Sequence, residues 1–122
     1  YYPDIIVPKA LAIGPKIQST FGKAYKRGVP ISFGTDAGVF PHGLNAKEFI
    51  YMVEAGMPEK ECIQSATITN AKILQKEDLL GQIASGYYAD IIATDYNPLD
   101  DISTLQNIVF IMKNGVVYKS VK

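Results

Sequence analysis

An aspartate directly after a strand-like run, Asp36, is the strongest candidate for chemistry in this sequence. Residues 29–34 are mostly apolar, and residues 35–38 have the small and polar side chains of a turn. In α/β folds, ligands and catalytic groups gather at the carboxyl ends of strands. An aspartate there can ligate a metal through oxygen or take a proton from a water. The alternative is that Asp36 only caps the turn or the next helix.

His42 is the only histidine, and it lies in a Gly/Pro-rich loop before a helical pattern. It could contact a substrate, or it could be a surface histidine. Cys62 shares a helix face with Ile63 and Ala66, which predicts a buried and inert thiol. A zinc site usually takes three or four ligands, mostly His or Cys, and this chain has one of each. The chain is therefore not expected to assemble a histidine-rich metal site alone.

The elements that must position these residues follow from apolar spacing. Residues 8–27 carry the stripe of an amphipathic helix, although Gly14-Pro15 allows the helix to begin only near Pro15. Residues 29–34 are predicted to form a strand. Further helices are predicted over residues 46–56, from Pro58 onward, and in a short segment that Asn70 would cap.

The pattern of apolar residues changes from mainly helical to strand-like after Leu80. Residues 81–83 and 89–94 are predicted to be strands, and Asn114-Gly115 between two apolar runs predicts a hairpin over residues 108–119. The fold class is therefore α/β, with a boundary near residues 80–86.

Composition narrows the range of partners. The chain has 122 residues, 48% of them hydrophobic, with 12 basic and 12 acidic residues. This balance gives no electrostatic reason to expect nucleic acid or an anionic membrane as a partner. The longest apolar run, Ile108 to Met112, is far shorter than the ~20 residues of a membrane span. A single cysteine and no signal sequence make the cytoplasm the expected compartment, and the start at Tyr1 suggests that residues once preceded it.

Six segments in this order resemble the amidohydrolase superfamily. Residues 28–38 with His42-Gly43 resemble its last barrel strand, and residues 48–58 resemble its final barrel helix. The remaining segments are Ser65–Ala71, residues 81–92, Asn97–Ile102 and Lys113–Val117. The subgroup that the chain resembles most is that of the imidazolonepropionase-like and Xaa-Pro-dipeptidase-like enzymes.

The resemblance implies the carboxy-terminal fragment of a (β/α)8 TIM-type barrel followed by strands of a small β-sandwich. Residues 1–80 would be the last part of the barrel, with strand eight and the final helices, and residues 81–122 would belong to the sandwich. A barrel needs about 250 residues, so most of it would lie outside this chain. The expected partners are therefore the missing amino-terminal barrel portion or a second copy of the chain.

The resemblance also implies a function, hydrolysis of an amide-type carbon–nitrogen bond in a cyclic amide or dipeptide-like small molecule. One or two divalent metals, commonly zinc, would activate the water. Asp36 would be a metal ligand and the catalytic proton shuttle, and His42 would contact the substrate. No activity is expected from the chain alone. The alternative is a non-catalytic structural or interaction module derived from the same fold.

Overall fold

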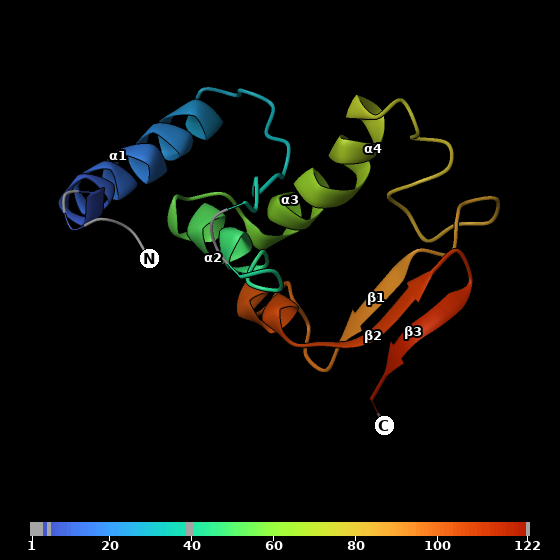
Figure 1. The fold of residues 1–122 in the computed structure, drawn as a ribbon. Coiled ribbons are helices and arrows are strands. Elements are labelled where there is room, and N and C mark those ends of the chain that lie inside the picture. Colours follow the sequence, from blue (N-terminus) through green and yellow to red (C-terminus); the bar gives the residue numbers. More distant parts are fainter. Residues whose placement is uncertain (1–3, 5, 39–40, 122) are drawn as a thin grey trace.

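The fold has helices first and a small sheet last (Figure 1). A computed structural model describes residues 4, 6–38 and 41–121. Within these residues the elements are α1 (Ile6–Lys26), α2 (Lys47–Glu54), α3 (Glu59–Gln64), the π-helical turn η1 (Ser65–Thr69), α4 (Asn70–Ile73), β1 (Ile91–Thr94), the 3₁₀ helix η2 (Ile102–Gln106), β2 (Ile108–Lys113) and β3 (Val116–Ser120). The predicted α/β class is confirmed.

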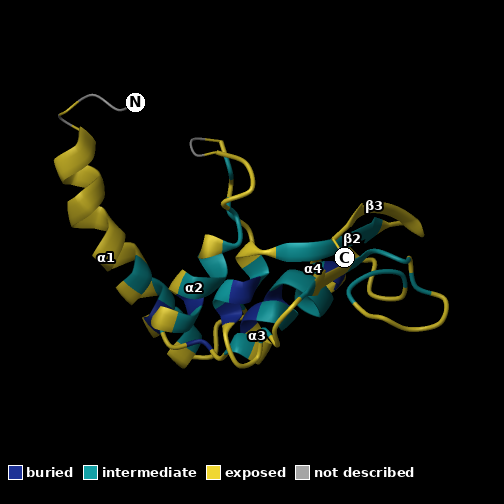
Figure 2. Cartoon of the chain, turned by 90° about the horizontal axis from the view of Figure 1, so that it is seen from below, coloured by how far each residue is buried: buried dark blue, intermediate teal, exposed yellow. Residues whose placement is uncertain are grey.

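Helix α1 is continuous and contains Pro15 in its interior. The alternative of a helix that begins near Pro15 is therefore wrong. Pro15 has no N–H to donate, so the helix loses one backbone hydrogen bond there without ending. The amino-terminal half of α1 projects from the molecule and is exposed (Figure 2). The carboxy-terminal half packs on α2, where a Cβ on Gly22 would lie 2.6 Å from the Ala55 carbonyl oxygen.

Helices α3 and α4 form one rod through η1, from Glu59 to Ile73. The prediction that Asn70 caps a separate helix is wrong, because Thr69 before it already has helical dihedrals. A capping residue needs non-helical backbone, which this position lacks. The Asn70 side chain is therefore free to bond outside the helix.

Residues 29–35 run extended but do not form the predicted strand. Among the described residues, the only sheet is the one formed by β1, β2 and β3, so this segment has no strand beside it to complete a ladder. Its Phe33 N–H instead donates to the Ser65 carbonyl oxygen in η1 at 3.3 Å. The strand-like residues therefore form an extended segment that bonds to the rod of α3, η1 and α4 and not to any strand that the structure describes.

The sheet has the order β1-β2-β3, with both pairs antiparallel. The predicted hairpin is confirmed, and its turn residues Asn114 and Gly115 have φ of 49° and 79°, the left-handed values that Asn-Gly favours. The predicted strand at residues 81–83 is wrong. Gly81 packs against η1 instead, where a Cβ would lie 2.9 Å from the Thr67 backbone.

The buried core is small and lies mainly between α2 and α3 (Figure 2). Its buried apolar centre is formed by Met52, Met57 and Cys62. Many large apolar side chains are exposed, including Leu11 at 73% and Val116, Val117 and Tyr118 of β3. None of the helices in the described residues is long and apolar enough to cross a membrane.

Candidate active site

Two aromatic rings and a set of hydrogen bonds position the segment that leads to Asp36. The ring of Phe33 stacks on Phe49 of α2, with centroids 4.2 Å apart and planes 19° apart. The Asn70 Nδ2 donates to the Phe33 carbonyl oxygen at 2.9 Å, and the Ser32 hydroxyl donates to Asn70 Oδ1 at 2.5 Å. The extended segment is therefore fixed to both α2 and the α3–α4 rod.

Asp36 follows this fixed segment with an exposed side chain. Its φ of 44° is left-handed, a conformation that costs most residues energy and that Asp tolerates better than most. Its carbonyl oxygen accepts from the Gly38 N–H at 2.8 Å. The backbone, rather than the carboxylate, makes this turn. Helix α2 begins at Lys47 without a side-chain cap, so the alternative of Asp36 as a helix cap is wrong.

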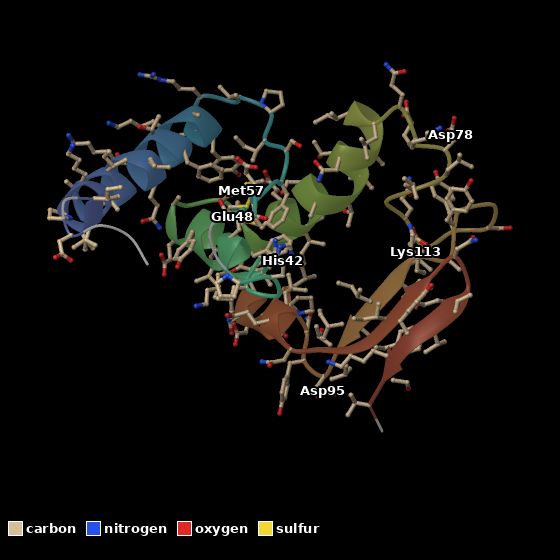
Figure 3. The ribbon with its side chains drawn as sticks, viewed as in Figure 1. His42, Glu48, Met57, Asp78, Asp95 and Lys113 are labelled. Carbon is tan, nitrogen blue, oxygen red and sulfur yellow. The ribbon has the colours of Figure 1, made fainter. Side chains whose placement is uncertain are left out.

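His42 is exposed in the loop that leads into α2 (Figure 3). Residues 39 and 40, between Asp36 and His42, lie outside the described residues. Gly43, directly after His42, has a φ of 97°, which a residue with a side chain rarely adopts. The turn that presents His42 therefore depends on a glycine.

Asn45 connects the two loops, and sequence reasoning did not single it out. Its Nδ2 donates to the Thr35 hydroxyl oxygen at 2.8 Å, and its Oδ1 accepts from the Gly43 N–H at 3.2 Å. Thr35 precedes Asp36 and Gly43 follows His42, so one amide bonds to a neighbour of each predicted site residue. An asparagine two residues before a helix, within a Gly/Pro loop, is the sequence signal that could have indicated it.

The described residues supply only part of a metal site. No three His, Cys, Asp or Glu side chains come together among residues 4, 6–38 and 41–121. The exposed carboxylate of Asp36 suits one oxygen position of a divalent metal's coordination shell. The residues present therefore fit a single ligand of such a site and not the whole site.

Cys62 is fully buried in the core, as predicted. Burial raises the pKa of its thiol to about 11, and the nearby carboxylates of Glu59 and Glu61 act in the same direction. A thiol with this pKa remains protonated at neutral pH, and the thiolate is the nucleophilic form. Cys62 is thus a packing residue.

Comparisons with known proteins find relatives along most of the chain. The model of the amidohydrolase family matches residues 6–122. The ochratoxinase of Aspergillus niger is 36% identical over 117 residues, which are 91% of this chain and 24% of that protein.

Two solved structures are similar along almost the whole chain. An Xaa-Pro dipeptidase with methionine bound in its active site is 54% identical, with a TM-score of 0.90 over 98% of this chain and 30% of that one. A prolidase in complex with N-methylphosphonate-L-proline is 28% identical, with a TM-score of 0.84 over the same shares of the two chains. The present chain thus spans about a quarter to a third of these relatives. The resemblance found in the sequence is confirmed, and the chain belongs to the amidohydrolase family, with Xaa-Pro-dipeptidase-like relatives.

Proposed function

We propose that this chain is the carboxy-terminal part of a metal-dependent amidohydrolase that hydrolyses the amide bond of Xaa-Pro dipeptides or similar small amides. The observation that carries the proposal is the exposed carboxylate of Asp36 at the end of a segment fixed by Phe33 and Asn70. The likeness to an Xaa-Pro dipeptidase at 54% identity supports the substrate class.

In this proposal Asp36 has two roles. Its carboxylate ligates a divalent metal, zinc in the first instance, with further ligands from outside the described residues. When bound, the one or two metal ions would polarise the amide carbonyl and lower the pKa of the attacking water towards ~7. Asp36 accepts the proton of that water and passes it to the leaving nitrogen. An exposed carboxylate on a fixed backbone suits this task, because a proton shuttle needs access to both partners.

His42 contacts the substrate in the same proposal. Its imidazole is exposed, and a ring nitrogen can donate a hydrogen bond to a substrate or accept one. Asn45 bonds to both Thr35 and Gly43, which brings the His42 loop to the loop of Asp36. Residues 1–80 would complete a (β/α)8 barrel and residues 81–122 would contribute strands to a β-sandwich. The exposed apolar side chains of α1 and β3 support a missing amino-terminal portion, or a second copy, as the partner that covers them.

The test compares the 122-residue chain with the full-length protein that carries it. Hydrolysis of Ala-Pro is measured for both in the presence of zinc. We expect turnover only by the longer protein, where Asp36→Asn should lower kcat/KM by at least about 10²-fold because a general acid–base group is lost.

Asp95→Asn is the matched control, since Asp95 is exposed at the turn after β1 (Figure 3). Full activity of Asp36→Asn would refute the role of Asp36. A full-length protein that binds no metal and hydrolyses no dipeptide would favour the non-catalytic module.

A further inference from the structure

We propose that Asn45 is a positioning residue that fastens the His42 loop to the Asp36 loop. This inference rests on the proposed function, because it assigns Asn45 to the same site. The Asn45 side chain hydrogen-bonds to neither Asp36 nor His42 itself. It bonds to Thr35 and Gly43, the residues adjacent to them in the chain.

The chemistry of the asparagine amide suits this position. Gly43 offers an N–H, so its partner must be the acceptor Oδ1. The orientation of the amide is thereby set, and Nδ2 is left to donate to the Thr35 hydroxyl oxygen at 2.8 Å. One planar group thus makes both bonds at once, and an apolar side chain of similar size could make neither.

Helix α2 provides the fixed base for this connection. The Asn45 carbonyl oxygen accepts from the Glu48 N–H at 3.1 Å, which ties its backbone to the first turn of the helix. Further along α2, Phe49 stacks on Phe33 and Met52 is buried in the core. Phe33 lies two residues before Thr35, so the stacked rings and the Asn45–Thr35 bond hold the same segment against the same helix. The position of the His42 loop is set relative to Asp36 through Asn45.

Two variants of the full-length protein test the connection from opposite ends. Asn45→Ala removes both bonds, whereas Thr35→Val removes only the bond on the Asp36 side and keeps the side-chain shape. Amide hydrogen exchange of Gly43 is the first readout. We expect exchange to accelerate about 2- to 10-fold in both variants, as for the loss of one net hydrogen bond. Thr35→Val is the more informative variant. It leaves the Gly43 N–H its acceptor, Asn45 Oδ1, so faster exchange of Gly43 must come from loss of the bond between Asn45 and Thr35.

The second readout is hydrolysis of Ala-Pro by the single variants and by the double variant. We expect each single variant to raise KM more than it lowers kcat, because His42 on the substrate side loses its anchor. We also expect the double variant to be no worse than Asn45→Ala, since the two residues act through one bond. Asn107→Ala, at an exposed asparagine after η2, should leave both readouts unchanged.

The outcomes separate the two proposals. Unchanged Gly43 exchange in Thr35→Val, or kinetic losses that simply add in the double variant, would overturn the positioning role. A wild-type protein that does not hydrolyse Ala-Pro would contradict the proposed function. The amide exchange rate of Gly43 would still test whether Asn45 connects the two loops.

Discussion

The segment that carries Asp36 and the carboxy-terminal sheet are held in different ways. Within the part of the chain that the structure describes, no strand pairs with residues 29–35. One backbone bond from Phe33 to Ser65 and single side-chain bonds, such as those of Asn70 to residues 37 and 38 positions away, hold this segment. The sheet is held by backbone ladders between adjacent strands, and Lys113 adds an ion pair to Asp90. A ladder shares its stability among many similar bonds, whereas the site segment depends on a few particular side chains. Single substitutions should therefore affect the site segment more.

The largest effect is expected from Met52→Ala, which removes a side chain from the core beneath the site. Met52 is 3% exposed, and truncation of a buried methionine costs about 2–5 kcal/mol. Urea unfolding of the chain, followed by circular dichroism, measures this loss. Ile83→Ala is the control, because Ile83 is 84% exposed and such a change should stay within about 0.5 kcal/mol. Equal losses of unfolding free energy in the two variants would show that the buried Met52 stabilises the fold no more than an exposed side chain does.

Asn70→Ala should have an intermediate effect. The variant leaves the part-buried Phe33 carbonyl oxygen without its partner, which costs about 1–3 kcal/mol. The Ser32 hydroxyl is exposed and can bond to water instead. Backbone chemical shifts should change at residues 31–36 and remain constant in β2 and β3. Shift changes spread evenly over the sheet would show that the two regions are not held separately.

The smallest effect is expected from the ion pair in the sheet. The hydrogen bonds from Lys113 and from the Asn114 N–H lower the pKa of Asp90 below its usual value of 3.8. A carboxylate with a lowered pKa in the folded state stabilises the fold above that usual value and loses this contribution as the pH falls through the folded pKa. Lys113→Ala should therefore lower Tm slightly at pH 7, and the loss should shrink as the pH falls through the folded pKa of Asp90. A loss that stays constant as the medium is acidified would assign the effect of Lys113 to packing.

Local signals in the sequence were sufficient for several elements. The hairpin at Asn114-Gly115 and the helix over residues 47–54 follow from turn chemistry and apolar spacing within a few residues. The burial of Cys62 also followed from its helix face. These predictions were correct because each depends on a short window of the chain.

Predictions that depend on distant partners failed. A strand at residues 29–34 needs a neighbouring strand. Residues 81–83 lie outside the sheet, and Gly81 packs against η1. Asparagine is a residue type that often caps helices. The side chain of Asn70 instead bonds to Ser32 and Phe33, more than thirty residues upstream. Asn45 was missed for the same reason, since its role depends on the approach of Thr35.

Strand β3 has a consequence for handling the isolated chain. It is the last strand of its sheet and is exposed throughout, with Val116, Val117 and Tyr118 among its residues. Such an edge is a template on which another strand can add by backbone hydrogen bonds. Lys119 places a charge on this edge, which opposes stacking of like chains. Aggregation of the isolated chain should therefore begin earlier as protein concentration rises and as added salt screens this charge.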